Sequence, residues 1–234
     1  MRFARLLNTR HLPVTAAVVI AVAAAIPAYA VSQGDHAHGH AHASAADHAH
    51  AHAVTARQLA FHDAMRKLWE DHVTWTRLAI VSYISDLPDL QATEARLLSN
   101  QVDIGNAIKP FYGKKAGAKL TSLLKQHILG AVDLMAAAKA GDNAAVAKAS
   151  GAWNANGHQI ADFLNSANPH NWPRKEMRSM MQTHLDQTLK EAVDRLGGKH
   201  AAEVRDYDAI HAHILEMADM LSAGIIKQFP ARFR

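Results

Sequence analysis

From residue 55 onward the chain carries the hydrophobic spacing of amphipathic helices. Apolar residues recur at intervals of three and four, and no segment shows the strict alternation of a half-buried strand. Turn-forming residues interrupt this pattern at regular intervals. The uninterrupted stretches predict six helices, over residues 55–86, 89–109, 115–140, 142–166, 173–196 and 199–227. Because the connections are short, we expect an all-α fold, an antiparallel up-and-down helical bundle that spans residues 55–230.

The first thirty residues have the pattern of a secretory leader. Three arginines precede an apolar run over residues 14–26, and residues 28–30 read Ala-Tyr-Ala, which fits the small-residue cleavage rule. The run is shorter than the ~20 residues that a membrane-spanning helix needs. We therefore expect a signal peptide over residues 1–30, a periplasmic or secreted protein, and no stable membrane insertion after the leader is removed.

The segment after the leader is rich in histidine. Seven of the seventeen histidines alternate there with small residues: His36, His38, His40, His42, His48, His50 and His52. Such a segment cannot bury a core, and neutral imidazole binds zinc, copper and nickel well. The pattern predicts a flexible metal-capture segment over residues 31–54. A low-complexity linker without a selected role is the alternative.

Composition narrows the remaining chemistry. Hydrophobic residues make up 49% of the chain and charged residues 20%, which excludes an intrinsically disordered protein. The absence of cysteine excludes iron–sulfur clusters, cysteine zinc sites, thiol catalysis and disulfides. The net charge is only +4, and the three leader arginines contribute most of it. We therefore expect no nucleic-acid partner.

Four further histidines lie at the centre of apolar stripes, each on a different predicted helix: His72, His127, His184 and His211. Burying four imidazoles in a small bundle is costly unless each finds a partner. A shared metal ion would satisfy them together, so the stripes predict a zinc, copper or nickel site with these four residues as ligands. The alternative is a set of core histidines satisfied by ordinary hydrogen bonds.

Polar residues precede two of these histidines in a matching order. Asn100 and Asp103 come before His127, and Asn156 comes before His184. This echo predicts a duplicated helical hairpin in which the three polar side chains face the histidines and orient them or add ligands. Asp208 lies three residues before His211 and is expected to orient it. Coincidence within an alanine-rich helical sequence is the alternative.

Four short segments of the chain resemble those of a family of proteins. Residues 68–77 read LWEDHVTWTR, 109–113 KPFYG, 138–142 AKAGD and 224–230 GIIKQFP. Over residues 65–230 the chain resembles an uncharacterised family of bacterial helical proteins with an LWExHVxWTR-type motif. The resemblance implies a helical fold and no known activity. It places His72, His127 and His184 on histidines of the family pattern, whereas the position of His211 is acidic in that pattern.

Three functions are compatible with these observations. The first is an exported protein that buffers or delivers zinc, copper or nickel, with a metal transporter or acceptor protein as a partner. The second is a metal-dependent hydrolase or oxidoreductase, in which Asp103 or Asp208 would act as base. The third is a helical binding module whose histidines are structural. The histidine-rich segment favours the first, because a catalyst needs no multivalent tail, and we assign no catalytic residue.

Overall fold

The computed structural model describes residues 54–234, and this part of the chain is all-helical, as predicted. The predicted signal peptide and nearly all of the histidine-rich segment lie outside the described residues. The described part contains five α-helices and one short 3-10 helix: α1 (Ala56–Ile84), α2 (Leu90–Lys139), α3 (Asn143–Ala167), α4 (Arg174–Leu196), α5 (His200–Gln228) and η2 (Pro230–Phe233).

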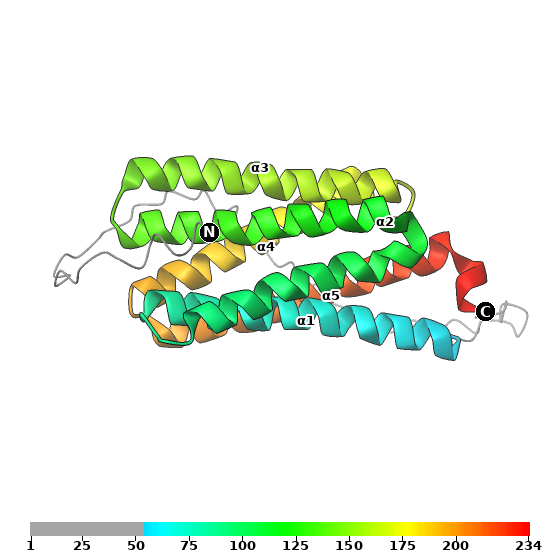
Figure 1. Cartoon of the computed structure of the whole chain (residues 1–234), viewed down its shortest axis with the longest axis horizontal. Coiled ribbons are helices and arrows are strands. Elements are labelled where there is room, and N and C mark those ends of the chain that lie inside the picture. The colour runs from blue at the N-terminus through cyan, green and yellow to red at the C-terminus, as the bar shows by residue number, and fades with distance from the viewer. Residues whose placement is uncertain (1–53) are drawn as a thin grey trace, which may run out of the picture. The chain divides into compact units, whose positions relative to one another are not determined.

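The long helix α2 differs from the sequence prediction. Two helices were expected here, separated at residues 109–113, but the chain stays helical through Pro110 and breaks only at Gly113. Gly113 has φ 85° and ψ 167°, a conformation that a residue with a Cβ rarely adopts. In Figure 1, α2 runs to one end of the bundle, turns there and runs back. The chain therefore reverses direction at a single glycine, without a separate loop.

The two halves of α2 pack closely where glycines face each other. A Cβ on Gly105 would lie 2.7 Å from the carbonyl oxygen of Gly117, and a Cβ on Gly117 would lie 2.5 Å from the carbonyl oxygen of Gly105. Real Cβ atoms essentially never come this near to a backbone oxygen. The absence of side chains at these two positions is what lets the halves approach after the turn.

Two helix starts follow directly from local sequence. Thr55 caps α1 by accepting a hydrogen bond from the backbone of Gln58, whose side chain bonds back to the backbone of Thr55. Asp142 caps α3 by accepting from the backbone N–H groups of Ala144 and Ala145. Both starts fall where the sequence predicted them.

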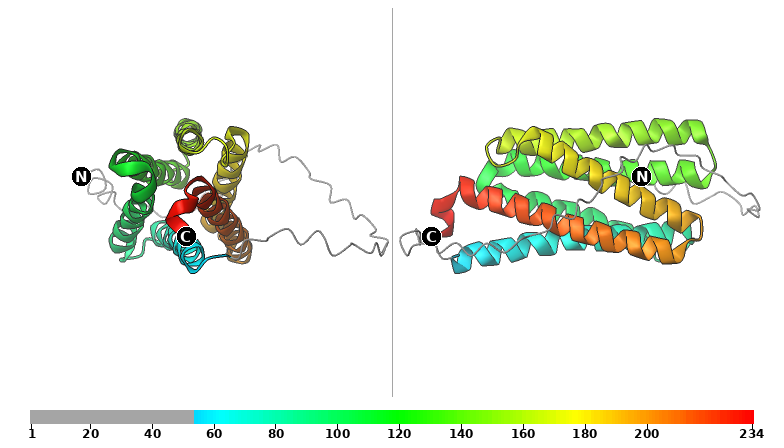
Figure 2. Two further views of the ribbon diagram at one scale, coloured as in Figure 1. Left: turned by 90° about the vertical axis from the view of Figure 1, so that its right-hand side faces the viewer. Right: turned by 180° about the vertical axis from the view of Figure 1, so that it is seen from behind.

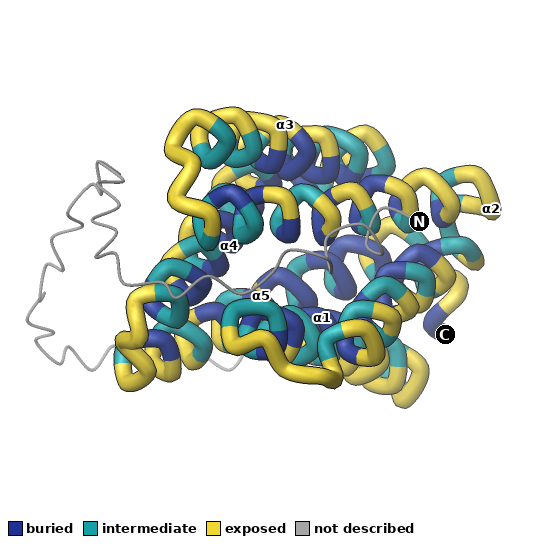
Figure 3. The backbone as a smooth tube through the Cα atoms, turned by 60° about the vertical axis from the view of Figure 1, so that its left-hand side comes forward, coloured by how far each residue is buried: buried dark blue, intermediate teal, exposed yellow. Residues whose placement is uncertain are grey.

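The core lies along the common interior of the helices. Figure 2 shows consecutive helices side by side, and α5 packs against both α1 and α4. In Figure 3 the buried positions gather on the inner sides of the helices and the exposed positions on the outside. Fully buried side chains include Ile160, Ile214 and Ile225. By length and composition α5 is apolar enough to cross a membrane, but here its apolar side contributes to this core.

Candidate functional site

Three of the predicted histidines meet in the interior. His72 on α1, His127 on the second half of α2 and His184 on α4 are each at most 4% exposed. The ring centroid of His184 lies 5.7 Å from that of His72 and 5.9 Å from that of His127. These three residues form what we call the histidine cluster, and it lies among the apolar side chains of the core.

Tryptophans hold two of the rings in place. Trp153 stacks on His127 at 5.2 Å between ring centroids with an interplanar angle of 16°, and its indole N–H donates to the backbone oxygen of His127 at 3.1 Å. Trp69 meets His72 edge-on at 5.8 Å. Each of these two rings therefore has a tryptophan on one side.

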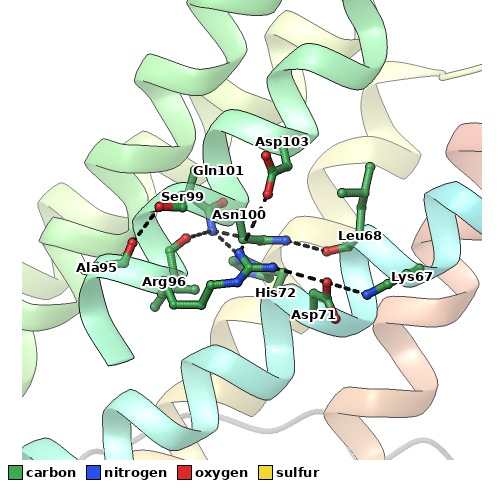
Figure 4. A network of polar contacts seen from close by, with 11 residues as sticks. Lys67, Leu68, Asp71, His72, Ala95, Arg96, Ser99, Asn100, Gln101 and Asp103 are labelled. Carbon is green, nitrogen blue, oxygen red and sulfur yellow. Dashed lines mark hydrogen bonds and ion pairs between the residues drawn. The ribbon is translucent and has the colours of Figure 1, made fainter. Parts of the chain in front are cut away.

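A buried amide supports the turn of α1 that carries His72. The Nδ2 of Asn100 donates to the carbonyl oxygen of Leu68 at 2.9 Å, and that carbonyl lies four residues before His72. The neighbouring Gln101 donates through Nε2 to the Nδ1 of His72 at 3.2 Å and to the Oδ1 of Asn100 at 3.1 Å. Figure 4 shows this network between α1 and the first half of α2.

The same arrangement recurs at the other two histidines. Asn156 on α3 donates to the carbonyl oxygen of Leu123 at 3.2 Å, and His213 on α5 donates through Nε2 to that of Met180 at 3.0 Å. Leu123 and Met180 each lie four residues before a cluster histidine, as Leu68 does. Three such contacts therefore occur, each between a helix that carries a cluster histidine and the helical segment that follows it. Asn100 and Asn156 contact the helices of His72 and His127, and not those of His127 and His184 as the sequence pattern predicted.

Burial keeps the three imidazoles neutral. It lowers the pKa of His72 to about 3 and that of His127 to about 4, and it lowers the pKa of His184 well below the usual 6.5. The proximity of the rings adds to this effect, because a proton on one histidine disfavours a proton on the next. His213 contributes to the lowered pKa of His184 in the same way. Neutral imidazole is the form that binds metals.

Several polar atoms around the cluster have no close hydrogen-bond partner within the described chain. They are the Nδ1 atoms of His127 and His184, the Oε1 of Gln101, the Oδ1 of Asn156 and the Oγ1 of Thr188. Thr188 lies one turn beyond the cluster, and the Nδ1 of His127 interacts with the amide of Asn156. Because an unsatisfied buried polar atom costs about 1–3 kcal/mol, the remaining atoms mark a place for bound water or a ligand.

The side chains as they stand do not form a ready metal site. Within residues 54–234 no group of three or more histidine, aspartate or glutamate side chains is arranged to hold a metal ion. The Nδ1 of His72 is engaged by Gln101, and the cluster contains no carboxylate. Metal binding would require the rings to turn so that their nitrogens converge, because metal–nitrogen bonds are about 2 Å long.

His211, the fourth predicted ligand, lies elsewhere. Its side chain is 33% exposed, and its Nε2 lies 3.0 Å from the Oε1 of Glu70. Its ring also packs near that of Tyr207. The buried face of α5 is centred on Ile210, Ile214 and Met217, so His211 falls at the edge of that face. Instead, α5 directs His213 toward the helix that carries His184.

Of the four polar residues expected beside the histidines, two are inside the bundle and two are not. Asn100 and Asn156 are buried, as described above. The side chain of Asp103 is 49% exposed, and its Oδ2 lies 3.7 Å from the Nη1 of Arg96. Figure 4 shows this contact. Asp208 is exposed on α5. A carboxylate is costly to bury without a partner, so both remain at the surface and neither is placed to act as base at the cluster.

Gln101 and His213 also contact the cluster or the helix that carries it, although the sequence pattern did not single them out. Gln101 is fully buried and lies at the spacing of Leu97 and Ile104, so its place on the apolar stripe could have been read from the sequence. His213 gave no such signal, because its role depends on which carbonyl the neighbouring helix presents.

Comparison with known proteins finds no match to a family model, a curated protein or a solved structure. The resemblance described from the sequence therefore remains a prediction. Any function has to be argued from the chemistry of the cluster and its surroundings.

Proposed function

We propose that this protein binds a transition metal ion inside the bundle through His72, His127 and His184, and that it buffers or delivers zinc, copper or nickel. The observation that carries the proposal is the buried Nδ1 of His184, which has no partner in the described chain, next to the buried ring of His127, whose Nδ1 interacts only with the amide of Asn156. Both rings are neutral and contact each other. An ion would bind a nitrogen of each ring at once.

The chemistry of the three residues suits this role. Three neutral imidazoles make a nitrogen donor set that zinc, copper and nickel accept, and a fourth position stays open for water or an outside ligand. In the structure the Gln101 amide donates to the Nδ1 of His72, which leaves the proton of this neutral ring on Nε2. To bind an ion through Nε2, the ring would instead donate from Nδ1 to an acceptor such as the unpartnered Oε1 of Gln101. The ring centroids of His72 and His127 lie 5.7 and 5.9 Å from that of His184, so the rings would have to turn for their nitrogens to converge on one ion.

The histidine-rich segment has a complementary role in this proposal. Its seven histidines would capture ions with modest affinity, and the bundle would hold one ion more tightly. The leader would export the protein to the periplasm or the outside, where a metal transporter or acceptor protein is the expected partner. No nucleic acid and no stable membrane insertion belong to this proposal.

We also infer the finer architecture. Because α2 turns back at Gly113, the described chain divides into three helical hairpins, namely α1 with the first half of α2, the second half of α2 with α3, and α4 with α5. The bundle is then an antiparallel up-and-down arrangement of six helical segments. The three repeated carbonyl contacts support it, since each joins the two arms of one hairpin.

The proposal is tested by thermal unfolding of the full chain in which the seven histidines of the histidine-rich segment are replaced by alanine. This segment then cannot contribute to any stabilisation by metal. At a metal concentration one hundred times Kd, binding to the native state adds about 2.7 kcal/mol. For a domain of this size, the melting temperature should rise by roughly 5–10 °C with the preferred ion relative to chelator.

A matched pair of substitutions tests whether the rise in melting temperature comes from the histidine cluster. His127→Ala in the same background should abolish the rise, whereas His170→Ala, at an exposed position, should preserve it. If zinc, copper and nickel all leave the melting temperature where chelator leaves it, the cluster histidines are structural core residues and the proposal is wrong.

A further inference from the structure

A second feature lies next to the histidine cluster, in the direction of the α1 C-terminus. It is a cavity of about 60 Å³ between α1, both halves of α2, Trp153 of α3, and α4. Its inner wall includes Thr76, Ala131 and Thr188, each four residues beyond a cluster histidine and therefore one helical turn away. Its other end is formed by partly exposed residues near the helix ends, among them Ile84 and Leu196.

The lining of the cavity is apolar except at three residues. Aliphatic side chains and Trp153 make up most of it, and Thr76, Thr188 and Glu94 are the exceptions. The hydroxyl of Thr76 already donates to the backbone oxygen of His72 at 2.7 Å. The hydroxyl of Thr188 has no partner in the described chain, although this residue is only 6% exposed. Thr188 is therefore a polar group available to a molecule inside the cavity.

Glu94 brings an uncompensated carboxylate to the same cavity. Within the part of the chain that the structure describes, no lysine, arginine or histidine nitrogen lies within 4 Å of it. The nearby cations are otherwise engaged, since Lys139 pairs with Asp86 and Arg96 with Asp71. A carboxylate beside an apolar cavity is a site for a molecule that combines a positive charge with an apolar body.

The positions of the two polar groups set the orientation of such a molecule. Glu94 lies seven residues before Gln101, which contacts His72, so it stands about 10 Å along the helix from the level of the cluster. Thr188 is only one turn from that level. The carboxylate therefore faces the outer part of the cavity and the free hydroxyl faces the inner part.

We propose that this cavity binds a primary alkylammonium ion, with its ammonium group on Glu94 and its alkyl chain against the aliphatic side chains that line the cavity. A cavity of 60 Å³ is about five times the volume that one water needs, which suits a chain of roughly four to six carbons. The binding of this cation does not depend on a metal in the histidine cluster, so it is a property separate from the proposed function.

Calorimetric titration of the full chain with hexylamine, in chelator at pH 7, tests the proposal. Saturable binding to one site is expected. 1-Hexanol should bind roughly tenfold more weakly, because it keeps the apolar chain but loses the charge interaction, and hexanoate should not bind detectably. The fluorescence of Trp153, which lines the cavity, should change with hexylamine along the same binding curve.

Substitutions distinguish the contribution of the Glu94 carboxylate to binding from that of the apolar cavity. Glu94→Gln should weaken hexylamine roughly tenfold and leave 1-hexanol unchanged, whereas Glu216→Gln, an exposed residue of the same type, should change neither. Ala192→Leu and Ala131→Leu fill the cavity from two different helices, and each should abolish binding of both ligands in protein whose helical circular dichroism is intact.

Three results would overturn the proposal. They are an absence of saturable hexylamine binding to the wild-type chain, hexanoate binding as tightly as hexylamine, and unchanged hexylamine affinity in the Glu94→Gln variant. The last two would show that the carboxylate does not select a cation, and the first that the cavity holds no such ligand.

Discussion

At the scale of single residues, buried amides stabilise the interior of the bundle. Asn100 is fully buried and both ends of its side chain are used, since its Nδ2 donates to Leu68 and its Oδ1 accepts from Gln101. Removing one partner from such a network leaves the others unsatisfied in an apolar environment, which costs more than the bond itself contributes.

Replacing Asn100 by alanine is therefore expected to lower the free energy of unfolding by roughly 1–3 kcal/mol, as measured by urea denaturation. Asn106→Ala is the matched control, because Asn106 lies on the same helix but is exposed, and it should change stability by less than about 0.5 kcal/mol. Equal effects of the two substitutions would show that the buried amide contributes no more than a surface one.

At the scale of elements, the direction of α2 depends on one backbone conformation. Gly113 has a positive φ, and a side chain would find open space there, so the cost of substituting it comes from the backbone alone. Gly151, within α3, provides the opposite case. It is helical and exposed, and a Cβ would also find open space.

Alanine at these two glycines should have effects of opposite sign. Gly113→Ala is expected to destabilise by about 1–3 kcal/mol, because the turn forces alanine into a strained conformation. Gly151→Ala is expected to stabilise by roughly 0.5–1 kcal/mol, because alanine is the better helix former. Thermal unfolding followed by circular dichroism measures both. A stabilised Gly113→Ala protein would mean that the turn is not fixed in this conformation.

At the scale of the whole molecule, buried titratable groups link stability to pH. His72, His127 and His184 have pKa values lowered by burial, so below pH 6.5 the unfolded chain binds up to three protons that the folded chain does not. Glu191 acts in the opposite sense, because burial raises its pKa to about 7 although Arg77 contacts it. Between about pH 6.5 and 4.5 the folded state therefore binds one proton more at Glu191.

These terms predict a net excess of two protons on the unfolded chain in that window. The free energy of unfolding should fall as the pH decreases from 6.5, by up to roughly 2.7 kcal/mol per pH unit. Urea denaturation at several pH values measures the slope. Glu191→Gln removes the opposing term and should make the slope steeper, whereas a flat profile between pH 6.5 and 5 would show that the histidines are not held neutral.

The sequence by itself determined the helical class, most helix boundaries and the burial of three histidines. These follow from local rules. The period of the apolar residues selects helix over strand, Thr55 and Asp142 cap helices through their own side chains, and a residue at the centre of an apolar stripe faces the core. His72, His127 and His184 follow this last rule, since each is at most 4% exposed.

Only the tertiary structure decided which of these residues meet. His211 and His213 are two positions apart on one helix, but the rotation of α5 against its neighbours places His211 beside the half-exposed Glu70 side chain of α1 and His213 on the backbone carbonyl of Met180, one turn before His184. The turn at Gly113 depends likewise on how closely Gly105 and Gly117 pack. Local sequence specifies which face of a helix is apolar. The angle and register at which two such faces pack depend on residues far apart in the chain, and these decide where unpaired polar atoms gather.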